Sequence, residues 1–327
     1  MLPMTIENSS TVPPVKKVAL IGECMLELSG TAFGAMQQSY GGDTFNTAVY
    51  LQRCGGAALQ TWYATALGDD ALSAALQQRW AADGLQLDLV RTIAGRMPGL
   101  YQIEVDAHGE RRFSFWRDQS AARAYFDVAS TPLEARADSW DAFYFSGISL
   151  AILPPAGRER LIALALRLRQ RGATVVFDNN YRPRLWADKA TARTSFCQAF
   201  AAASTLLITA DDHQALFEFD SLDAAVADAQ ALQMPELVIK RGAADTLVRV
   251  NSSEGWAIWH SVPTELVLRV VDTTAAGDSF AAAYLSQRLQ GRPAAEAAQF
   301  GNRLAARVIQ HPGAIIPLAA MQDLLPV

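Results

Sequence analysis

The 327-residue sequence contains three cysteines, Cys24, Cys54 and Cys197, which lie far apart and form no CxxC pair. This pattern excludes a disulfide framework and a cysteine-rich zinc site, and an odd number of thiols is typical of a reducing compartment. No apolar run approaches the roughly 18 uninterrupted residues that a membrane-spanning helix needs. Basic residues are outnumbered, since 28 Lys and Arg stand against 33 Asp and Glu for a net charge of −5. That balance lacks the broad positive field of a general nucleic-acid-binding protein.

The first 15 residues are rich in polar side chains, include the pair Pro13–Pro14, and have no apolar segment before a small-residue cleavage site. They lack the pattern of a secretory signal, so we expect a disordered extension at residues 1–15 and a cytoplasmic protein. Half of the residues are hydrophobic, and the length suffices for one large or two ordinary domains. We expect one domain at residues 16–320.

Apolar strand-like runs alternate with amphipathic helical patterns along most of the chain. The strand-like runs are at residues 18–22, 61–67, 143–150, 174–180, 205–209 and 236–242. The helical patterns are at residues 44–53, 70–82, 155–171, 190–203, 222–232, 276–289 and 293–310, and three short strands are expected around residues 247, 258 and 270. This order predicts βαβ units and an α/β fold with a mostly parallel central sheet flanked by helices.

Residues 99–116 interrupt this alternation. Two runs of alternating apolar side chains flank turn-forming residues at 106–109, which predicts a β-hairpin. A hairpin inserted in a βαβ series is usually a flap or an edge addition, and the segment 27–40 could pair with it. We therefore expect a small β lid built from about residues 27–41 and 98–118.

The strongest chemical signal is the string DTTAAGDSF at residues 272–280, where a strand is followed by a helix start. The N–H groups of Ala276, Gly277 and Asp278 would point out of the helix N-terminus. That end carries roughly half a positive charge, which suits a phosphoryl group in transfer. The Asp278 carboxylate could accept the proton of an attacking hydroxyl, or it could be an acidic residue favoured at a helix start.

The string DTTAAGDSF closely resembles the signature of the ribokinase (PfkB-type) carbohydrate kinases, and the resemblance extends from about residue 18 to residue 317. Further elements similar to that family are GGDTFN at 41–46, DNNYR at 178–182, VIKRGAAD at 238–245 and GAIIP at 313–317. Within the family, the words GECMLEL and FDNNYRPRLWA resemble the kinases of 2-keto-3-deoxygluconate. The resemblance implies a ribokinase-like fold and transfer of the ATP γ-phosphoryl group to O6 of that sugar acid. It also implies Asp278 as general base, an anion hole of Ala275, Ala276 and Gly277, and a homo-oligomer formed through the lid.

A kinase for a sugar acid needs a cation for the substrate carboxylate, and two arginines are placed for it. Arg117 ends the lid strand, and Arg182 follows a strand end, where open parallel sheets bind ligands. A guanidinium offers a carboxylate a planar fork of donors, although each arginine could instead form a surface ion pair. The other expected substrate contacts are Gly42, Asp43, Asn46, Tyr101, Phe115 and Asp278, for which turn, cap and core roles are the structural alternatives.

The nucleotide side gives a weaker signal. The expected ATP contacts are Asn180, Lys240, Gly242, Thr274, Gly277 and Asn302. Lys240 could equally be a solvated charge at a strand end.

Mg²⁺ is expected with ATP, because nucleotide phosphates and one or two carboxylates normally hold it. The metal ligands stay unassigned, since no cluster of His, Cys and carboxylates has transition-metal spacing. Ala210 and His213 stand where the Asn and Glu of the family's N-x-x-E element would fall, and Asp211 or Asp212 could substitute.

Two further positions depart from the family pattern. Ala275 stands where the wider family usually has glycine, and it can serve the anion hole only if its backbone avoids positive φ. Phe115 stands where related sugar-acid kinases often carry a tyrosine, so one hydroxyl contact to substrate is missing. Two alternative functions are a fructokinase or other neutral-sugar kinase, which the arginine pair disfavours, and a non-catalytic sugar-acid sensor, which the presence of Asp278 disfavours.

Overall fold

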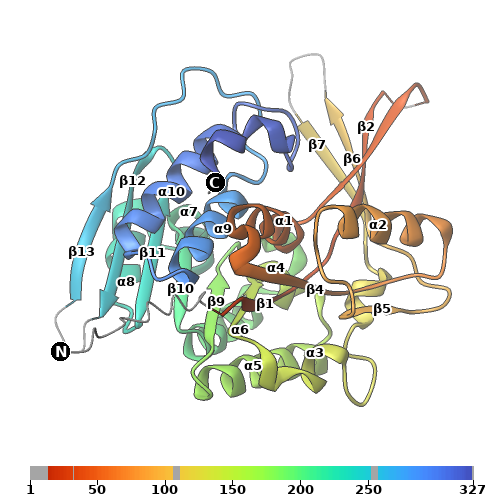
Figure 1. Cartoon of the computed structure of the whole chain (residues 1–327), viewed down its shortest axis with the longest axis horizontal. Helices are drawn as coiled ribbons and strands as arrows, with labels where there is room; N and C mark the ends of the chain where they lie inside the picture. Colours follow the sequence, from red (N-terminus) through yellow and green to blue (C-terminus); the bar gives the residue numbers. More distant parts are fainter. Residues whose placement is uncertain (1–13, 32, 106–110, 252–256, 326–327) are drawn as a thin grey trace, which may run out of the picture.

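The computed structural model describes residues 14–31, 33–105, 111–251 and 257–325, and its frame is a nine-stranded sheet (Figure 1). The strands of this sheet are β1 (Lys16–Ile21), β4 (Leu59–Leu67), β5 (Val90–Thr92), β8 (Ala142–Ser146), β9 (Thr174–Asp178), β10 (Thr205–Thr209), β11 (Glu236–Arg241), β12 (Ala244–Asn251) and β13 (Ala257–Val262). Their order across the sheet is β13-β12-β11-β10-β9-β8-β1-β4-β5. The strands from β11 to β5 are parallel, and β12 and β13 extend one edge in antiparallel fashion. The predicted α/β class is confirmed.

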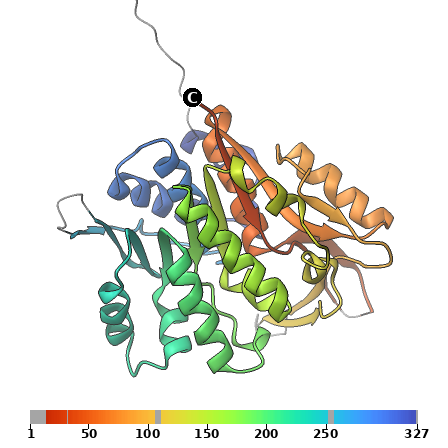
Figure 2. The same cartoon turned by 90° about the horizontal axis from the view of Figure 1, so that it is seen from below.

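Helices cover both faces of this sheet, as Figure 2 shows from below. They are α1 (Asp43–Gly55), α2 (Ala71–Ala82), α3 (Pro132–Ala135), α4 (Gly147–Ile152), α5 (Pro155–Gln170), α6 (Lys189–Ala202), α7 (Ala210–Phe217), α8 (Leu222–Ala231), α9 (Ala276–Leu289) and α10 (Ala294–Val308). No helix in the described ranges combines the length and the apolar character needed to span a bilayer.

The core is divided into two hydrophobic clusters, one on each face of the sheet. Ile21 of β1 belongs to the cluster that contains side chains of α5, α6 and α8, whereas its neighbour Leu20 belongs to the cluster that contains side chains of α1, α9 and α10. Because successive side chains of a strand point to opposite faces, a strand buried on both sides reads as a continuous apolar run. That is the pattern by which these strands were predicted.

A second, smaller sheet projects from one end of the body (Figure 1). It consists of β2 (Met25–Gly30), β3 (Met36–Gly41), β6 (Leu100–Val105) and β7 (Arg111–Trp116), in the order β3-β2-β6-β7. We call it the lid sheet. The turn predicted at residues 106–109, and nearly all of the predicted N-terminal extension, lie outside the described residues.

One predicted strand was wrong in part, and another was wrong altogether. The run expected as a strand over 143–150 leaves the sheet at Ser146, because the Ser146 and Ser149 side chains cap each other's backbone N–H groups and start α4. The strand expected around residue 270 does not form. Residues 263–273 follow an irregular path, and Leu266 and Leu268 there are fully exposed, so no apolar face of this segment is buried in a sheet.

Candidate active site

A cavity of about 1490 Å³ lies between the lid sheet and the carboxyl ends of β9, β10 and β11. This is the edge at which open parallel sheets bind ligands. Its wall contains all of the residues proposed from the sequence, namely Gly42, Asp43, Asn46, Tyr101, Phe115, Arg117, Asn180, Arg182, Lys240, Gly242, Thr274, Ala275, Ala276, Gly277, Asp278 and Asn302. The fold therefore brings together residues that lie far apart in the sequence, from Gly42 to Asn302.

The start of α9 faces this cavity. Ala275, the residue before the helix, has φ 61° and ψ 14°, so it does not meet the condition set for its part in the anion hole, which was a backbone without positive φ. A left-handed backbone costs a residue with a Cβ about 1–2 kcal/mol, and here the tight turn into α9 imposes it. The N–H of Ala276 donates to the Thr273 carbonyl at 3.3 Å. Helix geometry leaves the N–H groups of Gly277 and Asp278 without intrahelical partners, so they can bind an anion.

Asp278 lies in the first turn of α9 and is held from α1. The Asn46 Nδ2 donates to Asp278 Oδ2 at 2.8 Å. Burial of the carboxyl group raises the pKa of Asp278 to about 7, and the negative charge of nearby Asp43 adds to the shift. A carboxylate with a pKa near neutrality is suited to accept a proton at physiological pH.

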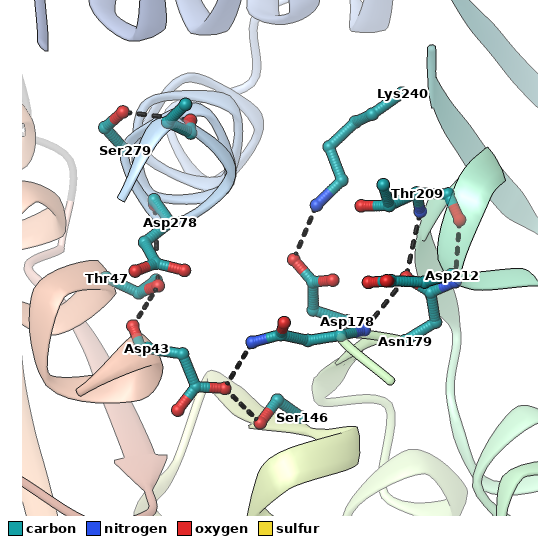
Figure 3. A network of polar contacts seen from close by, with 12 residues as sticks. Asp43, Thr47, Ser146, Asp178, Asn179, Thr209, Asp212, Lys240, Asp278 and Ser279 are labelled. Atoms are coloured by element: carbon teal, nitrogen blue, oxygen red, sulfur yellow. Dashed lines mark hydrogen bonds and ion pairs between the residues drawn. The ribbon is translucent and has the colours of Figure 1, made fainter. Parts of the chain in front are cut away.

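Asp43 begins α1 and forms the other half of this acidic pair. The Ser146 Oγ donates to Asp43 Oδ2 at 2.5 Å, and the Asn180 Nδ2 donates to the same oxygen at 2.8 Å (Figure 3). Burial raises the pKa of Asp43. Gly42 permits this close packing, because a Cβ there would lie 2.0 Å from the Glu23 carbonyl oxygen. The side-chain amide of Asn180 is thus hydrogen-bonded to Asp43. Its expected contact with ATP stays a prediction.

Lys240 is the penultimate residue of β11 and lies beside the start of α9. Its Nζ donates to Asp178 Oδ2 at 2.8 Å, and the Tyr144 hydroxyl donates to the same oxygen at 3.3 Å. A Cβ at Gly277 would lie 3.6 Å from Lys240 Nζ, which places the ammonium next to the anion-binding N–H groups. Lys240 is therefore a cation held within the wall of the cavity.

Arg117 lies where the lid sheet joins the body, and its side chain is buried against Glu23, with which it forms an ion pair. The Glu23 Oε1 and the Arg117 Nε are both buried without a hydrogen-bond partner in the ranges that the structure describes. Glu23 comes shortly after the end of β1, and Arg117 directly follows β7. Glu23 fixes the position of Arg117, which lines the cavity.

Arg182 is held more loosely. Its Nη1 donates to both carboxylate oxygens of Asp212, at 3.2 and 3.3 Å, and half of its side chain is exposed. Ion pairs at such exposure contribute about 0–1 kcal/mol to stability. Arg182 can therefore exchange this partner for a ligand at little cost.

Helix α7 carries both acidic residues that were possible substitutes in the N-x-x-E element, Asp211 and Asp212, and it places them differently. Asp212 lines the cavity, whereas Asp211 is exposed and lies outside its wall. His213 points away from the cavity, because its Nε2 bonds to Asp228 Oδ2 at 2.8 Å and its ring packs against Phe217. Burial lowers the pKa of His213. Its place in the fold is that of a core side chain.

The lid side of the cavity is aromatic. The Tyr101 hydroxyl donates to Glu27 of β2, and burial raises the pKa of Tyr101 well above its usual range. Its ring lies 5.9 Å from that of Phe115, which in turn stacks on Phe113 at 6.3 Å. Phe115 is 48% exposed. These rings form an apolar wall that a sugar can contact.

The side chain of Asn302 on α10 is already fully hydrogen-bonded. It accepts from Thr246 Oγ1 at 2.9 Å and donates to the carbonyl oxygens of Val262 and Pro263 at 3.2 and 2.9 Å. Its evident role is to fasten the segment after β13 to α10. A direct contact of Asn302 with ATP stays a prediction.

Thr274 and Gly242 complete the predicted nucleotide side. The N–H and Oγ1 of Thr274 both bond to Asp272 Oδ1, at 3.0 and 2.7 Å, which shapes the turn before α9. Gly242 has φ 60° at the reversal between β11 and β12, a conformation that glycine adopts without strain.

Sequence reasoning gave no role to Asp178, which lines the wall, or to Glu23, which lies against it, and it named Asp212 only as one of two possible substitutes in the N-x-x-E element. Glu23 and Asp178 each follow or end a parallel strand, and Asp212 follows β10. An acidic residue at the carboxyl end of a parallel strand was the signal available for all three. Within the described ranges, no group of three or more His, Cys, Asp and Glu side chains is arranged to hold a metal ion.

The chain is similar to known proteins along most of its length. Residues 15–321 match the sequence pattern of the pfkB family carbohydrate kinases. The 2-dehydro-3-deoxygluconokinase of Dickeya dadantii (strain 3937) is 43% identical over 311 residues, which cover 94% of this chain and 98% of that protein. The enzyme of the same name from Escherichia coli (strain K12) is 42% identical over 310 residues, covering 94% and 99%.

Solved structures share the fold. A putative ribokinase II from Escherichia coli, crystallised in complex with ATP and Mg²⁺, has a TM-score of 0.78 at 19% identity and covers 95% of this chain and 99% of its own. This likeness concerns the arrangement of the chain, which is that of the α/β body and lid sheet described above.

Proposed function

The chain belongs to the pfkB family of carbohydrate kinases, and from that membership we propose that it transfers the γ-phosphoryl group of ATP to O6 of 2-keto-3-deoxygluconate, also called 2-dehydro-3-deoxygluconate. The support for the substrate is the identity of more than 40% to kinases named for it, over nearly the full chain. The observation that carries the chemistry is the carboxyl group of Asp278, with a pKa near 7, at the start of a helix that faces the cavity.

In the proposed reaction Asp278 is the general base. Its carboxylate takes the proton of the O6 hydroxyl while O6 attacks the γ-phosphorus. The bond between O6 and phosphorus forms, the bond from phosphorus to the β,γ-bridging oxygen breaks, and ADP leaves with the electron pair. Asn46 keeps the carboxylate oriented through its 2.8 Å hydrogen bond.

The N–H groups at the start of α9 and the ammonium of Lys240 would stabilise the charge on the phosphoryl group in flight. They lie side by side, since Lys240 Nζ is within 3.6 Å of a Cβ position at Gly277. Preorganised donors of this kind act in a site from which water is excluded and need no rearrangement during the reaction. Mg²⁺ bound with the nucleotide would neutralise phosphate charge, and the buried Oδ1 of Asp178, which lacks a partner among the described residues, is an oxygen of the kind this ion binds.

We assign the carboxylate of the sugar acid to the guanidinium groups of Arg117 and Arg182, and the sugar hydroxyls to Asp43, Asn46 and Tyr101. The support is that all five side chains line one cavity together with Asp278. Arg117 is preorganised by Glu23, and Arg182 is half exposed and free to turn toward a ligand. A guanidinium suits a carboxylate because it donates two parallel hydrogen bonds.

The test is an ADP-release assay with Mg-ATP, run separately on 2-keto-3-deoxygluconate, gluconate, fructose and ribose. Strong turnover on 2-keto-3-deoxygluconate alone is expected. Preference for fructose or ribose would keep the kinase activity and overturn the sugar-acid substrate. Binding of the sugar acid without ADP release would support a sensor in place of an enzyme.

We further propose that the enzyme is cytoplasmic, where ATP is available, and that two copies associate through the lid sheet. Trp116 of β7 is 58% exposed and lies on the face of the lid sheet opposite to Phe113 and Phe115, which line the cavity. A second copy would cover it. Sedimentation of the protein and of the Trp116→Glu variant tests this, with a dimer expected for the first and a monomer for the second.

A further inference from the structure

Glu27 is an acidic side chain of the lid sheet that lies next to the cavity wall without being part of it. It lies in the middle of β2 and is opposite Tyr101 where β2 pairs in parallel with β6. Tyr101 is in turn opposite Phe115 in the antiparallel pair of β6 and β7. Tyr101 and Phe115 line the cavity, whereas Glu27 lies outside its wall. An effect of Glu27 on a bound ligand would therefore pass through Tyr101.

The hydroxyl group of Tyr101 has a fixed direction. It donates to Glu27 Oε2. Burial, and then the hydrogen bond to Glu27, raise the pKa of Tyr101, so the phenol keeps its proton at physiological pH. A phenolic hydroxyl has a single proton to donate, although its oxygen can also accept. Because Glu27 takes that proton, Tyr101 Oη can offer a ligand only its lone pairs.

The ring of Tyr101 is held in place, and so is its oxygen. The side chain is 8% exposed, and the ring centroid lies 6.4 Å from that of Phe113 and 5.9 Å from that of Phe115. These contacts leave the ring little room to turn the hydroxyl away from Glu27. The direction of the hydrogen bond is therefore set before a ligand arrives.

The oxygen of Tyr101 lies near the residues that orient the proposed base. A Cβ at Gly41 would lie 3.9 Å from Tyr101 Oη and 3.4 Å from Asn46 Oδ1. The amide nitrogen of the same Asn46 donates to Asp278 at 2.8 Å. Gly41 itself lines the cavity. A sugar bound with O6 at Asp278 therefore has the oxygen of Tyr101 beside its chain.

We infer that Glu27 is a positioning residue for the sugar: by accepting the Tyr101 proton, it makes Tyr101 Oη an acceptor that selects a hydroxyl group of the substrate. The carboxylate and the ketone of the sugar acid can only accept hydrogen bonds, so they find no donor at Tyr101. They are thereby directed to the arginines, and the sugar is bound in one orientation. The inference rests on the proposed sugar-acid substrate and adds to it the direction of one contact.

The test compares 2-keto-3-deoxygluconate with two analogues in which fluorine replaces the hydroxyl group at C4 or at C5. Fluorine cannot donate a hydrogen bond. Calorimetry in the presence of a non-hydrolysable ATP analogue gives each Kd without turnover. In the unmodified protein at least one analogue should bind about 3- to 10-fold more weakly than the sugar acid, as expected for one lost hydrogen bond. In Glu27→Leu the Tyr101 hydroxyl is free to donate to fluorine, and this ratio of Kd values should fall below about twofold.

Glu104→Leu is the matched control, because Glu104 lies on β6, carries the same charge, lies outside the cavity wall and bonds to Gln102 instead. It should keep the ratio of the unmodified protein. Tyr101→Phe removes the hydroxyl group, so the ratio should fall there as well. Adding Glu27→Leu to Tyr101→Phe should change the Kd of the sugar acid by less than about twofold, since Glu27 acts through that hydroxyl.

The inference is overturned if Glu27→Leu keeps the ratio of the unmodified protein, or if the unmodified protein binds both analogues as tightly as the sugar acid. An unchanged ratio in Tyr101→Phe would overturn it as well, even where Glu27→Leu fails to fold. These results leave the proposed substrate standing. If the unmodified protein does not bind 2-keto-3-deoxygluconate, the proposed substrate is overturned, and the contact inferred here is overturned with it.

Discussion

We call the floor of the cavity the part formed by the end of β9 and the starts of α1 and α9, which carry Asp178, Asp43 and Asp278. The floor and the lid sheet hold polar side chains in different ways. On the floor, Asp43, Asp178 and Asp278 each bond to side chains from other elements, and burial keeps them in a poorly solvated environment. The lid sheet instead presents aromatic rings that are about half exposed, with Tyr101 and Arg117 as its anchored polar groups. Under the proposed function, the difference predicts that the floor sets the rate of phosphoryl transfer and that the lid contributes to the selection of the substrate.

The largest expected effect tests the floor. Asp278→Asn should lower kcat by about 10²- to 10⁴-fold on every sugar that turns over, because an amide cannot take the hydroxyl proton. Binding of ATP and sugar, measured by calorimetry, should change little, since the Asn46 contact can persist. A kcat within tenfold of the unmodified enzyme would remove Asp278 from the role of base.

The next effect concerns pH. The pKa of Asp278 is raised to about 7, so below that pH the carboxyl group is protonated and cannot accept the proton. We expect kcat/KM to fall about tenfold for each pH unit below 7 and to level off above it. The residual rate of Asp278→Asn should lack this slope between pH 5 and 7. The same slope in both proteins would assign the titration to another group.

The lid is tested at Arg117. Removing it alone would leave Glu23 buried and unpaired, which costs about 3–5 kcal/mol of stability. The double variant Arg117→Gln with Glu23→Gln leaves no unpaired charge. It should raise KM for 2-keto-3-deoxygluconate about 10- to 100-fold, as expected for a lost charge-assisted hydrogen bond, with kcat and the KM for fructose within threefold.

Arg112→Gln is the matched control for that variant, because Arg112 lies on β7, the strand that leads to Arg117, is exposed and is absent from the cavity wall. It should leave both KM values within twofold. Two results would contradict the division between floor and lid. One is an equal increase in KM for the sugar acid and for fructose in the double variant. The other is a decrease in kcat as large as the increase in KM.

The smallest effect concerns the backbone of the floor. Ala275→Gly should stabilise the protein by up to about 1 kcal/mol, because glycine adopts φ 61° without strain. Glycine loses more backbone conformational entropy than alanine on folding, and this offsets part of the gain. Denaturant unfolding measures this change, and kcat should stay within threefold. A loss of stability greater than about 1 kcal/mol would mean that Ala275 does not adopt the left-handed conformation in solution.

Much of the fold could be predicted from the sequence, because strands buried on both faces and amphipathic helices leave local patterns. The helix start at Asp278 was found from a contiguous string, and the residues assigned to it lie together. The end of β8 was missed because the capping residues Ser146 and Ser149 are embedded in an apolar run. Local pattern there favoured a longer strand, and a side-chain cap decided otherwise.

The partners of the site residues could not be predicted from local pattern. Glu23 and Arg117 are separated by 94 residues, and Asp178 and Lys240 by 62. Such pairs form only when the sheet order brings strand ends together, and the sheet order was not predicted. The positive φ of Ala275 was missed for a related reason. Steric preference argues against it, and the requirements of the turn before α9 outweigh that preference.

The ion pair between Arg182 and Asp212 means that the sugar acid competes with an anion of the protein itself. In the protein alone the Asp212 carboxylate occupies the guanidinium group that we assign to the substrate carboxylate, so the sugar acid must displace it. At this exposure the displacement costs up to about 1 kcal/mol, or about fivefold in affinity. A neutral sugar leaves the pair intact and gains no contact with Arg182, so the pair helps to discriminate between the two classes of sugar.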